Sequence, residues 1–262
     1  MRVALGIEYD GTAFHGWQSQ PNGDTVQDAL ERALSEVAGT SLRVSCAGRT
    51  DAGVHALGQV AHFDSPVERP EQAWVRGTNA HLPASVAVRW AQTVDEEFHA
   101  RFSARSRSYR YLLNNRPQRP AFNAGRVGWY HRPLDVAAMS QAAQFLLGER
   151  DFSAFRAAQC QAKSPLKTLH QATVTRQGEM ILFDFRANAF LQHMVRNMVG
   201  ALVAVGAGKQ APQWIGELLE QRNRTLAAPT FAAAGLYFSG VEYDARWQLP
   251  WASSIMAPVI LV

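Results

Sequence analysis

One order of hydrophobic patterns occurs twice along the chain, and this repeat constrains the fold more than any other feature. In the first half, apolar residues alternate over residues 3–9, the periodicity of a β-strand. Helical spacing follows over residues 26–37, with Asp24 and Gln27 placed as a capping box and Gly39 as a stop. Short strand patterns then occur at residues 43–46, 59–64 and 86–90.

The second half follows the same order. Asp135 is placed to cap a helix and Gly148 to end it. Strand, helix, hairpin, apolar helix, further helix and last strand are predicted at residues 109–113, 135–146, 169–186, 190–205, 212–219 and 236–243.

This repeated order predicts an α+β fold made of two duplicated ferredoxin-like α/β units. We expect mixed, mainly antiparallel sheets joined across a central cleft, with helices on the outer face. The halves share no visible sequence identity, so the duplication rests on element order alone. The predicted domains are residues 1–104, which carry the Gly-Arg-Thr-Asp loop described below, and residues 105–247. Residues 248–262 form an unassigned tail.

Basic residues are concentrated in one stretch. The net charge is only +4, but the stretch from Phe98 to Leu134 contains no Asp or Glu. It contains eight arginines, at positions 101, 105, 107, 110, 116, 119, 126 and 132. The stretch is either a solvated basic face or a phosphate-binding surface, because arginine binds phosphate and the neighbouring aromatic rings can stack on unpaired bases.

Cysteine content and hydropathy bear on location. Two cysteines, Cys46 and Cys160, do not make a disulfide framework in a chain of 262 residues, so we expect a cytoplasmic protein. The N-terminus has too short an apolar core for a signal peptide, and the apolar run at residues 198–208 is too short to cross a bilayer. No membrane association is therefore expected.

The segment most informative about chemistry runs from Cys46 to Ala56, with the sequence CAGRTDAGVHA. Gly48 and Gly53 permit unusual backbone angles and close approach of a ligand. An arginine two residues before Asp51 can keep that carboxylate ionised, as a nucleophile or an electrostatic stabiliser. A structural Asx turn capped by arginine has the same pattern, so these residues alone leave both interpretations open.

Four motifs, in order along the chain, resemble the tRNA pseudouridine synthase A family. GRTDAGVHA resembles the active-site motif of that family, whose members modify uridines 38, 39 and 40 in the anticodon stem-loop of tRNA. The other three are EYDGTAFHGWQSQP at residues 8–21, FSARSRSYRY at residues 102–111 and ANAFLQHMVRNMVG at residues 187–200.

The resemblance implies an isomerase that converts uridine to pseudouridine with Asp51 as its catalytic carboxylate. It also implies that Arg49 assists base flipping, that Tyr109 stacks on the uracil, and that Arg196 is the partner of the carboxylate. The structural alternatives are an ion pair for Arg49, a core strand residue for Tyr109 and a snorkelling side chain for Arg196.

The expected partners are tRNA and a second copy of the chain. No cofactor is expected, because the reaction is redox-neutral. The VGAGKQ segment lacks the spacing of a phosphate loop, and the histidines lack metal-ligand spacing. The alternative classes are a non-catalytic RNA-binding protein and a glycoside or nucleoside hydrolase, for which the motifs supply only Glu8 and Asp10 as further carboxylates.

Other polar residues of the motifs have less defined roles. His15, Trp17, Gln18 and Gln20 either contact RNA or fold their loop, and the sequence does not choose between these roles. His55 and His62 are expected to be structural, and Cys46 to be a small buried residue.

Overall fold

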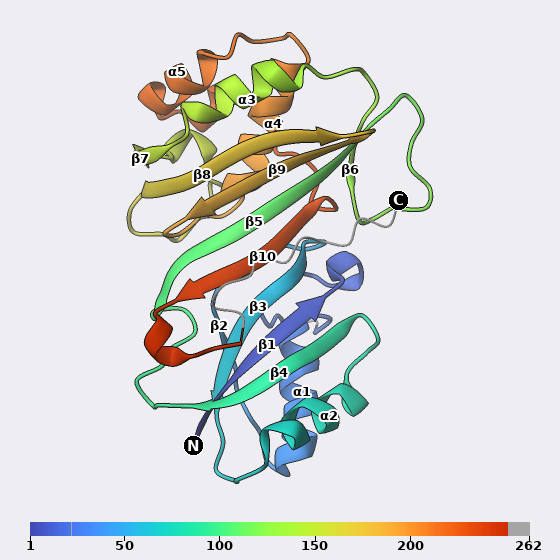
Figure 1. Cartoon of the computed structure of the whole chain (residues 1–262), viewed down its shortest axis with the longest axis vertical. Coiled ribbons are helices and arrows are strands. Elements are labelled where there is room, and N and C mark those ends of the chain that lie inside the picture. Colours follow the sequence, from blue (N-terminus) through green and yellow to red (C-terminus); the bar gives the residue numbers. More distant parts are fainter. Residues whose placement is uncertain (22, 251–262) are drawn as a thin grey trace. The chain divides into compact units, whose positions relative to one another are not determined.

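The computed structural model describes residues 1–21 and 23–250, which form two compact units (Figure 1). Unit 1 comprises Met1–Arg107 and the segment that begins at Tyr237, and unit 2 comprises Ser108–Leu236. The chain passes between the units inside two strands, β5 (Ala104–Asn115) and β10 (Leu236–Tyr243). The hydrophobic pattern does not reveal that most of β10 belongs with the first unit. It does so because it pairs in parallel with the strand that begins at His55.

In unit 1, four strands lie in the order β4, β1, β3 and β10. The bounds of the first three are Val86–Val94, Arg2–Tyr9 and His55–Asp64. β1 is antiparallel to both neighbours, and the short β2 (Ser45–Cys46) pairs with β3. The helices α1 (Val26–Ala38) and α2 (Glu71–His81) pack against each other, and α2 packs against β4 (Figure 1).

The predicted capping box of α1 is wrong by one residue. Thr25 is the N-cap and accepts a hydrogen bond from the backbone nitrogen of Asp28, 3.2 Å away. Asp24 lies outside the helix with a left-handed backbone (φ 57°), so its side chain is not the cap. Gly39 ends the helix as predicted, with φ 71°.

In unit 2, the strands β5, β9, β8 and β7 are neighbours in that order, and the short β6 (Gly128–Tyr130) pairs in parallel with β5. The bounds of the other three are Met180–Ala187, Leu166–Gln177 and Gly148–Asp151. The helices of this unit are α3 (Val136–Gln144), α4 (Met194–Gly206) and α5 (Trp214–Gln221). Four short 3-10 helices complete the described elements, at Gly11–Ala13, Ser153–Phe155, Arg224–Leu226 and Ala245–Trp247.

Two predicted helix ends in unit 2 are displaced. Asp135 caps α3 as predicted, but the helix ends at Gln144, and Gly148 (φ 85°) begins β7 instead. The apolar helix α4 begins at Met194 rather than at residue 190, because its N-cap His193 has a left-handed backbone (φ 61°). The mixed α+β class is as predicted.

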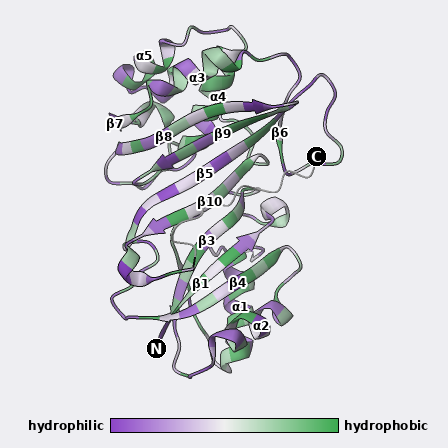
Figure 2. Ribbon diagram, in the orientation of Figure 1, coloured by the Kyte–Doolittle hydropathy of each residue, from purple (hydrophilic) through white to green (hydrophobic). Residues whose placement is uncertain are grey.

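Hydrophilic and hydrophobic residues are mixed along β5 and β9 (Figure 2), and their buried apolar side chains, among them Tyr111, Leu113, Phe183 and Phe185, contribute to the core. Helix α4 is buried along most of its length, which explains its almost continuous apolar sequence. Within residues 1–21 and 23–250, no helix combines the length and the apolar content needed to span a bilayer. The predicted tail, apart from residues 248–250, lies outside the described residues.

Candidate active site

The loop that carries Asp51 connects β2 to β3, and its first residues are tied to β3. The backbone nitrogen of Ala47 donates to the carbonyl of Val60, 2.8 Å away. The fully buried side chain of Gln59 donates to the Gly48 carbonyl at 2.7 Å and accepts from the Gly48 nitrogen at 3.4 Å. The start of the loop is therefore held like an additional strand.

The loop that follows β1 supports Asp51 from both sides. The nitrogen of Trp17 donates to the Thr50 carbonyl at 3.0 Å, and the nitrogen of Gly53 donates to the Phe14 carbonyl at 3.3 Å. Close contact requires glycine at position 16, because a Cβ there would lie 2.7 Å from the Thr50 carbonyl oxygen. These contacts place the backbone of residues 50–53 on a fixed support.

Buried side chains hold the residue before Asp51. The hydroxyls of Tyr9 and Thr50 are 2.7 Å apart, and both side chains are buried. Burial raises the pKa of Tyr9 above its ordinary value, so its hydroxyl stays protonated and can donate. The N-terminal motif thus acts on the Asp51 loop from its buried side.

The two polar side chains of the loop differ in environment. Asp51 is half-buried, whereas Arg49 is exposed and has no hydrogen-bond or ion-pair partner among the residues that the structure describes. The structural alternative for Arg49, an ion pair, is therefore absent from the described contacts. Next to the loop, the half-buried Cys46 has a pKa of about 12, raised by burial against the opposing charge of Arg49.

Tyr109 and Arg196 both lie in unit 2. Tyr109, on β5, is buried and meets the ring of Phe190 edge-on, with centroids 4.9 Å apart. Arg196, on α4, is half-buried, and its Nε donates to the Phe231 carbonyl at 2.8 Å. The charge of Arg196 also acts on the buried hydroxyl of Tyr111.

A search against protein families matches the tRNA pseudouridine synthase family over residues 6–103 and 142–244. The chain belongs to this family.

Named relatives agree with this membership over nearly the whole chain. The tRNA pseudouridine synthase A of Dechloromonas aromatica (strain RCB) is 66% identical over 250 residues, covering 95% of each chain. That of Thiobacillus denitrificans is 59% identical over 253 residues, covering 97% of each. A solved structure of a Cbf5-Nop10-Gar1 complex aligns at 11% identity and a TM-score of 0.36, over 90% of this chain and 48% of that one, a likeness too weak to add to the assignment.

In this member of the synthase family, the arginine stretch is only partly available to a ligand. Arg107 donates to the Ala47 carbonyl, where the Asp51 loop begins. Three others pair with carboxylates, in the pairs Arg105–Asp244, Arg110–Asp184 and Arg116–Glu179. Three arginines of the stretch are exposed and have no described side-chain hydrogen bond or ion pair, and they are Arg101, Arg119 and Arg132. The clustering of eight arginines in the sequence therefore overstates how many of them are available to bind phosphate.

The structure also resolves the open residues of the synthase's N-terminal motif. Trp17 is buried and belongs to the fold of the loop, whereas His15 and Gln18 are exposed. His55 is buried, and its Nδ1 lies 3.0 Å from the Gly11 nitrogen and 3.2 Å from an oxygen of Asp10. Neither motif predicts by its own sequence that the N-terminal motif and the GRTDAGVHA motif contact each other through His55.

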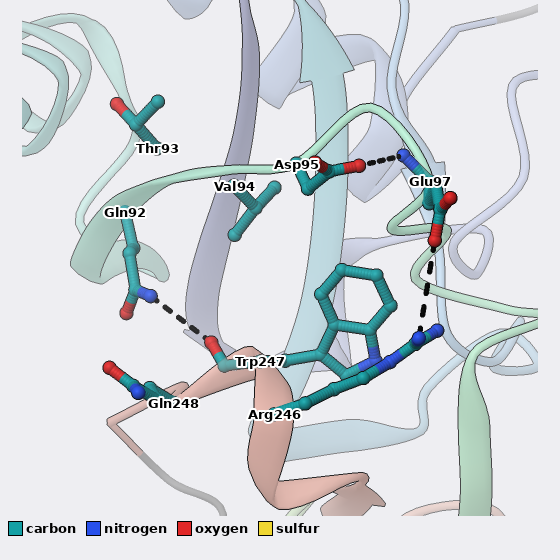
Figure 3. Close-up of a pocket in the computed structure, with 8 residues that line it drawn as sticks. All are labelled: Gln92, Thr93, Val94, Asp95, Glu97, Arg246, Trp247 and Gln248. Atoms are coloured by element: carbon teal, nitrogen blue, oxygen red, sulfur yellow. Dashed lines mark hydrogen bonds and ion pairs between the residues drawn. The ribbon is translucent and has the colours of Figure 1, made fainter.

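A hollow of about 420 Å³ lies elsewhere in unit 1 and contains none of these residues (Figure 3). Gln92 donates to the Trp247 carbonyl at 3.2 Å, and Arg246 lies 4.0 Å from Glu97 across the hollow (Figure 3). Among the described residues, no group of three or more His, Cys, Asp or Glu side chains is arranged to hold a metal ion.

Proposed function

We propose that this chain isomerises uridine to pseudouridine in tRNA, at positions 38, 39 and 40 of the anticodon stem-loop, with Asp51 as the catalytic carboxylate. The family membership supports the reaction and the substrate class. The observation that carries the role of Asp51 is its position on a loop that backbone hydrogen bonds at Thr50 and Gly53 hold on both sides. Such support is what a reacting group needs to keep its geometry.

The chemistry requires one anionic group and no redox partner. The bond from ribose C1′ to N1 of uracil breaks, the base turns, and C1′ joins C5. The proton on C5 leaves, and N1 gains one. A carboxylate favours the positive charge that develops on the sugar when the first bond breaks, or it attacks C1′ or C6 directly. Half-burial of Asp51 strengthens either action, because water screens the charge less.

The other site residues are proposed from the family resemblance. Tyr109 would stack on the uracil while it turns, and Arg196 would supply positive charge to the carboxylate. Arg49 would assist extrusion of the base, a role that suits an exposed guanidinium with no hydrogen-bond or ion-pair partner among the described residues. We further propose that the protein works as a homodimer in the cytoplasm.

Tritium release from tRNA labelled at uracil C5 tests the proposal. Asp51→Asn keeps the shape of the side chain and removes its charge, so we expect release to fall to background while tRNA binding persists. Asp24→Asn is the matched control, because it makes the same change at an exposed carboxylate of unit 1 and should leave release unchanged. Turnover near the wild-type rate in Asp51→Asn would remove Asp51 from its role. Binding without turnover by the wild-type protein would favour the non-catalytic alternative.

A further inference from the structure

The aromatic rings in the basic stretch differ widely in exposure. Phe98 and Tyr111 are fully buried, and Tyr109 is 9% exposed. Phe102, by contrast, is 76% exposed and Phe122 is 83% exposed, so the contacts of each ring decide which of them could receive a base.

The exposed ring of Phe102 packs against a pair of histidines. The His99 ring lies against Phe102, with centroids 4.3 Å apart and planes inclined by 35°. The His99 ring in turn meets the ring of His62 on β3 edge-on, with centroids 4.6 Å apart. The Nδ1 of His99 also accepts from the backbone nitrogens of Arg101 and Phe102, at 3.1 and 3.4 Å. The Phe102 ring therefore packs against a histidine ring that is itself held by hydrogen bonds.

The charge around this ring suits a phosphate. The guanidinium of Arg101 lies 5.6 Å from the centre of the Phe102 ring. Burial lowers the pKa of His62 to about 4, and it also lowers that of His99, so the support beneath the ring is uncharged at neutral pH. The positive charge at the ring thus comes from an arginine, which can reach the phosphate of a nucleotide whose base lies on the ring.

A short chain of contacts links the ring to the Asp51 loop. The guanidinium of Arg107 donates both to the Arg101 carbonyl and to the Ala47 carbonyl, where the loop begins. On the other side, His62 pairs in register with Ser45 of β2, the strand that leads into the loop. A nucleotide bound at Phe102 would lie on the same scaffold that positions the loop.

We propose that Phe102, supported by His99 and flanked by Arg101, is a stacking platform for one unpaired base of the tRNA, separate from the uridine that reacts. This inference rests on the proposed function for the identity of the RNA. Its occupant is a nucleotide because a planar apolar face beside a guanidinium matches a base with its phosphate.

The test is the affinity for an unmodified tRNA transcript, measured as a function of salt in the Asp51→Asn background so that turnover plays no part. Phe102→Ala should weaken binding roughly 5- to 150-fold, the range for loss of one base–aromatic stack. The slope of log Kd against log salt should not change, because no charge is removed. Arg101→Gln should instead reduce that slope by about one. Phe102→Trp should bind like the parent protein.

Phe122→Ala is the matched control. Phe122 is 83% exposed but has no aromatic or cation partner in the described contacts, so it is not held ready for a base. Affinity of Phe102→Ala within about twofold of the parent would overturn the platform. Equal losses in Phe102→Ala and Phe122→Ala, or in Phe102→Ala and Phe102→Trp, would also overturn it. None of these outcomes bears on turnover, so failure of the platform and failure of the proposed function are separable.

Discussion

Replacing Tyr9 by phenylalanine removes the hydroxyl that holds Thr50, the residue before Asp51. The two side chains are 4% and 8% exposed, and their oxygens are 2.7 Å apart. A buried hydroxyl left without this partner costs about 1–3 kcal/mol, so we expect the free energy of unfolding to fall by about that amount.

The same change should slow catalysis more than it weakens binding. Displacement of a reacting group by about 1 Å costs on the order of 100-fold in rate, so we expect kcat to fall about 10- to 100-fold. The affinity for tRNA should stay within about twofold, because Tyr9 is buried and does not reach the RNA. Urea unfolding, tritium release under saturating tRNA and filter binding measure the three quantities.

Tyr243→Phe is the matched control for this prediction. Its buried hydroxyl donates to the Ala100 carbonyl at 2.6 Å, so the stability cost should be similar while kcat stays near the wild-type value. In a double-mutant cycle, Tyr9→Phe and Thr50→Val should be coupled by about 0.5–1.5 kcal/mol in unfolding free energy. An unchanged kcat in Tyr9→Phe, or an equal fall in Tyr243→Phe, would refute the claim that this hydrogen bond positions Asp51.

Three further predictions concern pH, backbone and salt. Burial lowers the pKa of His62 to about 4, so as the pH falls the unfolded chain protonates this histidine before the folded chain does. The free energy of unfolding should therefore drop by roughly 1–3 kcal/mol between pH 7 and pH 4, and His62→Asn should reduce this pH dependence in urea unfolding. Gly16→Ala places a Cβ 2.7 Å from the Thr50 carbonyl oxygen at a residue with φ 93°, so it should displace the Asp51 loop and lower kcat at least tenfold. A wild-type rate of tritium release would show that the loop tolerates this displacement. Affinity for tRNA should decrease steeply with salt, since phosphate contacts release counterions, and a flat response in filter binding would exclude the arginines as docking residues.

Local patterns in the sequence predicted the elements that bury one regular face. The alternation of β1 and the helical spacing of α1 are strong because each sets apolar residues against a core. Helix α2 was missed, since it buries only Trp74 and Thr78 and has no side-chain cap at Pro70. The cap of α1 was misplaced because Asp24 and Thr25 are both capping residues, and only the backbone angle decides between them.

The sequence predicts candidate site residues, but it does not predict the contacts that support their loop. The GRTDAG motif predicts Asp51 as the candidate carboxylate, yet nothing in its spacing predicts that the backbones of Trp17 and Phe14 hydrogen-bond to the loop on both sides of Asp51. Likewise, charge alone could not show that Arg110 pairs with Asp184, which lies 74 residues away in the sequence. Such contacts join residues that are far apart in the sequence, and local sequence patterns do not predict them.

The central claim is that the carboxylate of Asp51 makes pseudouridine in the anticodon stem-loop. Mapping pseudouridine in tRNA from cells that lack this protein, supplied with either the wild-type chain or Asp51→Asn, tests it most directly. The account predicts that the wild-type chain restores the modification at positions 38, 39 and 40 and that Asp51→Asn, present at the same level, restores none. Restoration by Asp51→Asn, or modification by the wild-type chain only at other positions, would contradict it.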